Sequence, residues 1–521
     1  MALIPILGVP STFRVPGQFA EIVFAQGPSS AAAAAREVIL VMPLWPGATP
    51  APVWTVNTVY RVRNEQDLID GAGAGSPLHR AGRVFLQSNR TAKLWALPYS
   101  PSSGMGVATA DETVTWATDP TGTGVTTLTV CGEPNSVGFD SSDTVTTIAT
   151  DMVGVINSKV HLPVVATNAM GVLTLTAKIS GESQGDGTTG VIRLRAEIDS
   201  GVGTTVVAAA GALGLAGTAG VDGATTESAN LTTALSAIDA ARYYFMGFSV
   251  WDATPVGAAV THISAKSEPL PGLRSVGVAG FTGSLSLAQT LATGRNYERL
   301  QLVWQPNSEH DTAHLVGNML GIRQKYEEKD SATNFDSYRR SGDWLILPAF
   351  SQGDWPDTTD QNDAINDGVA PIASDGSGSK LVMSTTTRSK NAAGTVDDFR
   401  VTETHRVSVA DEYTDTLLLR HALNYENKKL KGDQLLSDGT VDNNQRLFPN
   451  VVTPHQYKPF VKRLLQEFED AAKIQNAQTS KDGLRVVRDP QNGGRLEVGH
   501  DLHVIDLLHQ TTFRLAEVST G

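Results

Sequence analysis

Short apolar runs alternate with amphipathic segments along much of the chain. Residues 38–44 form a continuous apolar run, which is typical of a strand buried on both faces. Ser76 and Pro77 supply an N-cap and a first-turn proline, and apolar residues follow them at helical spacing. Residues 94–97 form a second apolar run. The pattern therefore predicts a β-α-β unit in this part of the chain.

The same alternation resumes later in the sequence. It predicts a helix, two strands, a helix, a strand and a helix at residues 231–241, 244–251, 275–280, 285–292, 300–304 and 311–328, respectively. Such alternation is typical of a mainly parallel sheet flanked by helices. The predicted fold class is α/β within an α+β multidomain chain, with this sheet as its core.

Residues 101–240 differ in charge and in pattern. They contain 14 acidic and 4 basic residues, a net charge of −10, whereas the whole chain carries −13. Alternating runs such as residues 125–130 and 172–178 are separated by Gly-rich turns, which favours antiparallel β structure. We predict that residues 101–227 form an inserted, acidic, outward-facing β-domain.

A third region follows the Asp-, Gly- and Ser-rich residues 352–380. Its pattern predicts a strand near residues 381–386, a long helix over residues 411–430 and an amphipathic helix over residues 454–474. Strand-like segments close the sequence at residues 495–498, 502–508 and 511–518.

Both ends of the sequence offer strands that have no obvious partner. Residues 15–25 read as an extended arm, and residues 495–521 read as a second one. An unpaired strand is a liability unless another chain pairs with it. We therefore predict inter-subunit strand contacts for the apolar side chains of both arms, namely Phe13, Val15, Phe19, Ile22, Phe24, Leu502, Val504, Phe513, Leu515 and Val518.

These patterns divide the 521 residues into several domains, because a single core rarely exceeds about 250 to 300 residues. The predicted units are an N-terminal extended arm (1–30), an α/β domain (31–100 plus 228–375), the inserted β-domain (101–227), a C-terminal domain (376–494) and a C-terminal strand arm (495–521). Hydrophobic residues make up 40% and charged residues 18%, which indicates a folded chain.

Charge and cysteine content exclude several classes of protein. The net charge of −13 repels a nucleic-acid backbone, so we expect no nucleic-acid partner. The single cysteine, Cys131, excludes an internal disulfide framework and leaves too few thiolates for a structural zinc site. No signal peptide is evident, and the uncharged residues 201–221 are too weakly apolar for a membrane span. We therefore expect a cytoplasmically made protein without membrane insertion.

One motif suggests catalysis but lies in the wrong context. Residues 181–185 fit the G-x-S-x-G pattern of a hydrolase, with Ser183 as the nucleophile. That motif needs a strand before it and a helix after it, whereas here a strand-like segment, residues 191–196, follows. A hairpin loop is the favoured interpretation, and a serine hydrolase that uses Ser183 remains a distant alternative.

Candidate ligand sites are also incomplete. His310 and His314 have the spacing of two zinc ligands on a helix, but Asp311 stands where the general-base Glu belongs and no third ligand is apparent, so we interpret them as a solvated helix start. The glycines of residues 71–75 lack a P-loop signature, the aspartates of residues 352–375 lack EF-hand order, and three histidines match no metal template: His500, His503 and His509. We predict no enzyme activity and no catalytic, cofactor-binding or metal-binding residues.

Several stretches together suggest a family. In order along the chain they are FRVPG (13–17), GAGSP (73–77), KLWALP (93–98), LTLTAK (173–178), ATGRN (292–296), TTTR (385–388), DDFR (397–400) and TLLLR (416–420). In these stretches and their order the chain resembles the tail sheath proteins of contractile-tailed bacteriophages, in particular the Mu-like branch. Another tail or baseplate protein, or the sheath of a phage-derived injection device, remains an alternative.

The resemblance implies a structural role. It implies a subunit that stacks as six-membered rings around a tail tube and contracts to drive the tube through the host envelope for genome delivery. It makes residues 376–494 a C-terminal sheath domain that faces the tube, and it implies that terminal arms pair with strands of neighbouring subunits. The implied partners are other copies of the chain, the tail tube protein, and baseplate and tail terminator proteins. The implied location is the virion tail, after assembly in the host bacterial cytoplasm.

A hypothesis about the inner face follows from the resemblance. The amphipathic helix at residues 454–474 carries Lys458, Lys462 and Arg463. These cations are candidates for contact with an acidic tube surface. The alternative is an ordinary solvated helix face, because exposed charges are common on helices.

Overall fold

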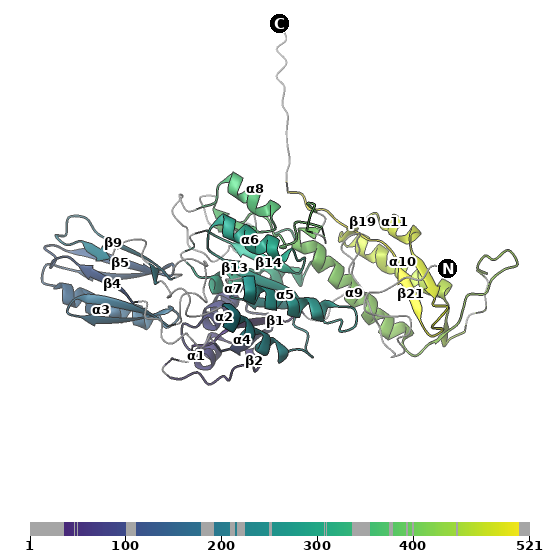
Figure 1. Ribbon diagram of the computed structural model, residues 1–521, viewed down its shortest axis with the longest axis horizontal. Coiled ribbons are helices and arrows are strands. Elements are labelled where there is room, and N and C mark those ends of the chain that lie inside the picture. Colours follow the sequence, from purple (N-terminus) through teal and green to yellow (C-terminus); the bar gives the residue numbers. More distant parts are fainter. Residues whose placement is uncertain are drawn as a thin grey trace, which may run out of the picture.

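A computed structural model shows a three-part molecule (Figure 1). It describes residues 36–509, except for the segments 101–110, 179–191, 209–213, 216–223, 250–252, 336–354 and 375–378 and the positions 46, 49, 307, 309, 392–393, 399–400, 444–445 and 447. A central unit lies between an insert on one side and a C-terminal unit on the other (Figure 1). None of the described helices is both long and apolar enough to cross a membrane.

An eight-stranded sheet forms the core of the central unit. Its order is β16-β15-β14-β13-β12-β1-β3-β2, in which every neighbouring pair from β15 to β3 is parallel and the two edge strands are antiparallel. The strands are β1 (Val38–Pro43), β2 (Tyr60–Val62), β3 (Leu94–Tyr99), β12 (Phe245–Phe248), β13 (Val276–Phe281), β14 (Leu300–Trp304), β15 (Ala370–Ser374) and β16 (Ser379–Leu381). The predicted α/β fold class with a mainly parallel sheet is confirmed.

Helices cover both faces of this sheet. One face carries α1 (Glu65–Ala72), α2 (Pro77–Ser88) and α7 (Thr312–Glu327), and the other carries α4 (Ala224–Ser236), α5 (Ala253–Ser267), α6 (Leu285–Arg295) and α8 (Thr358–Asn366). Within β1 the side chains alternate: Val38 and Leu40 enter the first core, and Ile39 and Val41 enter the second. The continuous apolar run at residues 38–44 is therefore explained by burial on both sides.

A glycine allows helices α2 and α7 to approach each other closely. A Cβ atom on Gly317 of α7 would lie 2.2 Å from the carbonyl oxygen of Ala81 in α2. Real Cβ atoms essentially never approach a backbone atom so closely, so only glycine fits at this crossing. The two helices thereby bury Leu78 and Phe85 of α2 against Val316 and Leu320 of α7.

The insert combines two antiparallel sheets with a helix. One sheet has the order β10-β4-β8-β7 and the other β11-β9-β5-β6. The strands are β4 (Asp111–Trp116), β5 (Gly124–Val130), β6 (Glu133–Phe139), β7 (Val164–Ala169), β8 (Val172–Ala177), β9 (Ile192–Ile198), β10 (Val206–Ala208) and β11 (Gly214–Leu215). The antiparallel β structure predicted for the insert is confirmed, but helix α3 (Val145–Ser158), which packs into the insert core, was not predicted.

The C-terminal unit is built around two helices. Its elements are α9 (Thr404–Tyr425), β17 (Lys429–Leu430), β18 (Val451–Val452), α10 (Pro454–Asp470), β19 (Ile474–Gln475), α11 (Ala477–Asp482), β20 (Arg485–Arg488), β21 (Leu496–Gly499) and β22 (His503–Val504). Apolar residues of α10, including Val461, Leu464 and Leu465, form the middle of its core. Three two-stranded sheets surround them.

The sequence prediction for the second half of the chain needs several corrections. Helices α5, α8 and α11 and strand β15 were not predicted, and α8 and β15 lie in the Asp-, Gly- and Ser-rich residues 352–380. Helix α9 begins at Thr404 instead of residue 411, and the segment from residue 495 has partners within the chain. There β21 pairs with β20, and β22 pairs with β19. By contrast, the strand predicted at residues 300–304 and the helix predicted at residues 311–328 are confirmed as β14 and α7.

Candidate functional site: a buried ionic joint at helix α9

Four arginines lie at one edge of the central sheet, each just before a parallel strand. Arg36 precedes β1, Arg242 precedes β12, Arg274 precedes β13 and Arg299 precedes β14. Parallel neighbours begin at the same edge of a sheet, so these guanidinium groups converge there. The sheet consequently presents a row of cations to whatever packs against that edge.

Helix α9 supplies the matching anions. Asp415 lies four residues after Asp411 and three after Glu412, so it shares a side of the helix with each of them. Other positions of the same helix are apolar: Val407 packs in the core of the central unit, whereas Val409 packs in the core of the C-terminal unit. Helix α9 is therefore a shared element of both units.

Asp411 is the centre of the contact. Its carboxylate accepts two hydrogen bonds from Arg299, with Nη1–Oδ2 at 2.7 Å and Nη2–Oδ1 at 2.9 Å, and a third from the Tyr244 hydroxyl at 3.1 Å. Nε of Arg274 lies 3.6 Å from Oδ1. The side chain of Asp411 is 0% exposed. A charge at this depth is tolerated only because its partners are fixed around it.

A second carboxylate extends the contact along α9. Asp415 accepts Nη2 of Arg274 at 2.6 Å on one oxygen and Nη2 of Arg242 at 2.6 Å on the other. Arg242 also donates from Nε to the backbone carbonyl of Arg274 at 3.1 Å. Arg242 is thereby held by two acceptors, and Arg274 by a hydrogen bond to Asp415 and an ion pair with Asp411.

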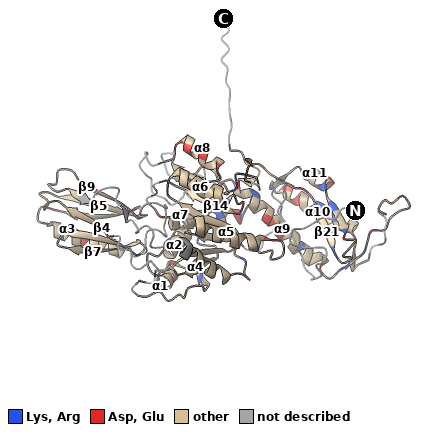
Figure 2. Ribbon diagram, viewed as in Figure 1, with Lys and Arg blue, Asp and Glu red and all other residues tan. Residues whose placement is uncertain are grey.

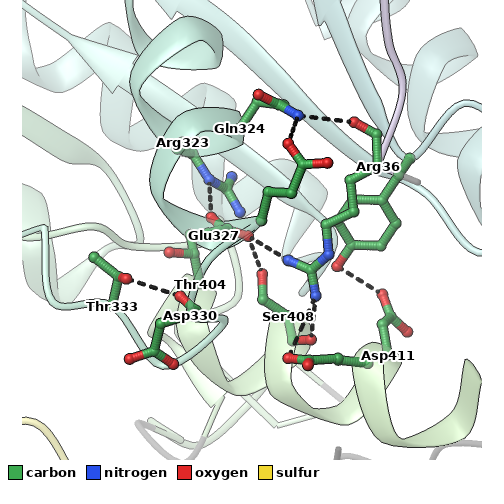
Figure 3. A network of polar contacts seen from close by, with 12 residues as sticks. Arg36, Arg323, Gln324, Glu327, Asp330, Thr333, Thr404, Ser408 and Asp411 are labelled. Atoms are coloured by element: carbon green, nitrogen blue, oxygen red, sulfur yellow. Dashed lines mark hydrogen bonds and ion pairs between the residues drawn. The ribbon is translucent and has the colours of Figure 1, made fainter. Parts of the chain in front are cut away.

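The third part of the contact involves helix α7 (Figure 3). Arg36 reaches Oε2 of Glu327 at 3.3 Å and the backbone carbonyl of Ser408 at 3.0 Å, and Arg323 binds Oε1 of Glu327 at 2.6 Å. The Ser408 hydroxyl also hydrogen-bonds Glu327, and the guanidinium of Arg36 lies 4.6 Å from the centre of the Tyr244 ring. We call this whole set of side chains on the sheet edge, α7 and α9 the ionic joint.

The charges of the ionic joint are stabilised by each other. Burial alone would raise the pKa of Asp411, but Arg299, Arg274 and Arg242 outweigh it and hold that pKa below its usual value. Burial works against the charge of Arg36 and Arg299 too, yet the facing anions raise the pKa of both guanidinium groups. Asp411, Arg36 and Arg299 therefore stay charged at neutral pH.

Further ion pairs connect α9 to the end of the C-terminal unit. Nζ of Lys473 lies 2.7 Å from Oε1 of Glu412, and Arg406 pairs with Asp506. Glu403 is the N-cap of α9, and its Oε2 lies 3.1 Å from Nδ1 of His405. Burial alone would raise the pKa of Glu403, but the contact with His405 lowers it to about 2. Figure 2 marks acidic and basic positions along the ribbon of α9. These ion pairs thus hold the buried first half of α9 near both of its ends.

The ionic joint has the chemistry of a rigid connection. It contains no hydroxyl or thiol beside a free general base, and the carboxylates that it holds are already bound by guanidinium groups. Within the described residues, no group of three or more His, Cys, Asp or Glu side chains is placed to hold a metal ion. The arrangement holds the sheet and the C-terminal unit together, because many directional contacts must change before either can move.

The sequence analysis did not identify the ionic joint, although a signal was present. A basic residue stands one to three positions before each of the four strands β1, β12, β13 and β14. Parallel topology turns that repeated position into one surface. Their partners on α9 lie more than 100 residues away from Arg274 and Arg299, so the pairing itself could not be read from the sequence.

The residues predicted as tube-facing lie on the exposed side of α10. Lys462 and Arg463 are exposed, and Lys458 is half-buried one turn before Lys462. Arg463 is 82% exposed, and its Nε lies 2.9 Å from Oε1 of Glu467 within the same helix. The two lysines therefore share a face, whereas the charge of Arg463 is partly neutralised.

Most of the predicted arm residues lie outside the described residues, as does Ser183. This applies to Phe13, Val15, Phe19, Ile22 and Phe24 at one end and to Phe513, Leu515 and Val518 at the other. Leu502 and Val504 are described, and for them the prediction of a strand without a partner is wrong. Both are buried in the core of the C-terminal unit, and Val504 pairs with Ile474 of β19.

The histidine pair at the start of α7 is not solvated as predicted. His310 is 5% exposed and His314 is 9% exposed, and their rings stack with centroids 3.8 Å apart. Asp311 is the N-cap of α7 and accepts a hydrogen bond from the backbone N–H of His314 at 3.1 Å. The two imidazoles belong to the contact region between the central unit and the insert.

Comparisons with known proteins give a distant structural likeness. No protein-family model matches the sequence, and no curated protein matches it. Among solved structures, the chain is similar to a sheath tail protein from Desulfitobacterium hafniense at 12% identity and a TM-score of 0.44, covering 96% of this chain and 100% of that one. It is also similar to a sheath tail protein from Listeria innocua at 10% identity and a TM-score of 0.43, covering 92% of this chain and 94% of that one.

Proposed function

We propose that the chain is a structural, non-enzymatic subunit of a contractile tail sheath. The observation that carries the proposal is the ordered set of stretches, from FRVPG at residues 13–17 to TLLLR at residues 416–420, in which the sequence resembles that family. The subunits stack as six-membered rings around a tail tube in the virion tail, and their contraction drives the tube through the host envelope. Assembly takes place in the host bacterial cytoplasm.

The three-part architecture and the ionic joint support this role. A contracting lattice has to move each subunit as a body, and a joint with buried, multiply bonded charges resists deformation when its ends are pulled. Energy is stored when the extended lattice assembles, so contraction needs no nucleotide. A contact between different surfaces of neighbouring copies, which does not close on itself, produces a filament.

Strand exchange between subunits has a suitable acceptor in the C-terminal unit. Strands β20 and β21 form a two-stranded sheet in the described residues, so each has an edge without a strand neighbour. An extended segment from another copy can add to such an edge through main-chain hydrogen bonds, which survive a rigid movement of the units. Residues 15–25 and 510–521 are the proposed donors.

Electron microscopy of the purified full chain, concentrated without partners, tests the proposal. We expect striated hollow tubes of uniform width. Deletion of residues 1–25 or of residues 510–521 should abolish the tubes and leave folded particles; the cut is placed at residue 510 because β21 and β22 belong to the folded core. Small particles in every sample, even with a tail tube protein supplied, would favour a different tail or baseplate component.

Contact with the tube is a separate proposal about α10. Charge reversal of Lys458 and Lys462 should reduce co-assembly with the tail tube protein at least tenfold, because the exposed face of the helix would then repel an acidic surface. Co-sedimentation of tubes and sheath measures the effect. Reversal of Lys325 and Lys329, a pair with the same spacing at the end of α7, is the matched control. Equal co-assembly of both variants would show that α10 is an ordinary solvated face.

A further inference from the structure

Four of the chain's 11 histidines gather where the insert meets the central unit. His79 lies in α2, His310 and His314 lie at the start of α7, and His161 lies in the insert between α3 and β7. His161 and His79 are near enough to influence each other's charge. This contact region is separate from the ionic joint, which lies at the other end of the central unit (Figure 1).

The turn between β5 and β6 of the insert closes over His310. Gly132 in this turn has a φ of +77°, and a Cβ atom there would lie 2.5 to 2.9 Å from three ring atoms of His310. The imidazole also hydrogen-bonds the backbone of Cys131 and stacks on the ring of His314. The insert therefore forms one wall of the site that buries His310.

Polar groups from both units make up the rest of this contact. Nζ of Lys178 in the insert donates to the carbonyl of Ala74 in the central unit and to that of Val160 in the insert, both at 3.0 Å. Arg83 of α2 links the two units, because it lies 3.3 Å from Glu65 of α1 and 3.5 Å from Glu133 of the insert. Charged side chains therefore contribute to the contact from both units.

The charges around His310 oppose a proton on its ring. The titratable and charged groups of this region are His79, Arg80, Arg83, Glu65, Cys131, Glu133, Lys159, His161, Lys178, Asp311 and His314. Burial is the main cause and the facing His314, Arg80 and Arg83 add to it, so the pKa of His310 lies well below its usual value. Burial also lowers the pKa of His79.

We propose that this contact region is an acid-opened latch, in which protonation of His310 releases the Cys131–Gly132 turn from α7 and lets the insert change its orientation. The closed arrangement excludes the proton, whereas the open one exposes the imidazole to water. Acid therefore favours opening, beginning as the pH falls through about 6.5, the ordinary value for histidine. The latch is a property of the single chain and does not depend on polymerisation.

The carboxylates do not cause the change in this pH range. His161 and Arg83 hold the pKa of Glu133 at about 2, and His79 and Arg83 lower that of Glu65. A carboxyl with a lowered pKa contributes its full stabilisation above its ordinary value of about 4.5 and loses it only as the pH falls towards the lowered value. Between pH 7.5 and 5.5 both carboxylates consequently remain charged, and opening follows the histidine.

Cys131 is a natural reporter for the latch because it is the chain's only cysteine and lies in the moving turn. It is 5% exposed in the closed arrangement, and burial raises the pKa of its thiol to about 12. The experiment measures the rate at which 4,4′-dithiodipyridine modifies the full chain, divided by the rate for the urea-unfolded chain at the same pH. The inverse of this ratio is the protection that the fold gives to the thiol. We expect the protection to fall about tenfold between pH 7.5 and 5.5.

Two histidine variants identify the group responsible. His310→Gln should keep the thiol protected at both pH values, because glutamine can still hydrogen-bond the turn but takes up no proton. His262→Gln, which removes a histidine of α5 far from the insert, should leave the tenfold change intact. Hydrogen exchange of residues 130–134 in the unmodified chain, corrected for intrinsic rates, gives a second readout if His310→Gln folds poorly.

Three results would overturn the latch. The first is that protection of the Cys131 thiol stays constant from pH 7.5 to 5.5. The second is that it falls equally in His310→Gln. The third is that it falls only when the far-ultraviolet circular dichroism signal is lost as well. The last outcome would mean that the chain unfolds as a whole.

Discussion

Replacing Asp411 with alanine should destabilise the chain by about 3 to 5 kcal/mol, the usual cost of breaking a buried ion pair by removing one partner. The cost arises because the buried partners of Asp411 would be left without an acceptor. Arg299 would lose both of its hydrogen bonds to the carboxylate, and the Tyr244 hydroxyl would lose its acceptor, all in a site that water does not reach. Urea unfolding of the purified chain, followed by circular dichroism, measures the loss.

The matched control for this substitution is Asp363→Ala, at an exposed carboxylate of α8. Surface changes of that kind shift stability by no more than about 0.5 kcal/mol. If Asp411→Ala and Asp363→Ala unfolded at the same urea concentration, the ionic joint would contribute no more to stability than a surface carboxylate. It would then no longer support the proposal of a rigid connection between the sheet and the C-terminal unit.

A double variant separates the loss of attraction from the cost of an unpaired charge. Asp411→Leu combined with Arg299→Met removes both members of the closest pair, and it should be less destabilising than Asp411→Leu alone. Buried pairs contribute little net stability relative to apolar residues, but a single buried charge left without a partner is expensive. Coupling energies of about 0.5 to 3 kcal/mol are usual for residues in contact. Additive effects would mean that Arg274 and Asp415 dominate the joint.

The central fold was predictable because burial left a clear pattern in the sequence. Strand β14 is buried on both faces and was predicted with its observed bounds, and Asp311 marks the start of α7 as an N-cap should. Both features are local: each depends on a few consecutive residues. The parallel order of the sheet then follows from the alternation of strands and helices.

Helices α1, α3, α5, α8 and α11 were not predicted, and for α3 and α5 the composition explains why. Helix α3 is rich in Val, Thr and Ile, which favour strands, and only its buried positions Ile148, Met152 and Ile156 show helical spacing. Helix α5 is mainly Ala, Thr, Ser and Gly, and its buried side chains are few and small. In both cases tertiary packing determines the helix, and intrinsic propensity contributes little.

The ionic joint could not be predicted from one sequence for a different reason. Asp411 occupies a predicted helix, where an acidic residue normally faces water, and nothing local distinguishes it from the exposed Glu426 at the end of the same helix. Its function depends on Arg299, which is 112 positions away in the chain. Only the topology of the sheet brings the two together.

The crossing of α2 and α7 provides a second test with a large expected effect. Gly317→Ala should destabilise the chain by about 1 to 3 kcal/mol or more, because the new methyl group would lie 2.2 Å from the carbonyl oxygen of Ala81 and the helices would have to separate. Gly154→Ala is the matched control, since Gly154 is also inside a helix but has no atom within 4 Å of its Cβ position. There alanine should be neutral or stabilise by up to about 1 kcal/mol, through helix propensity alone. Urea midpoints for the two variants should therefore move in opposite directions; if Gly317→Ala instead matched Gly154→Ala, the close approach would not constrain how α7 packs on α2.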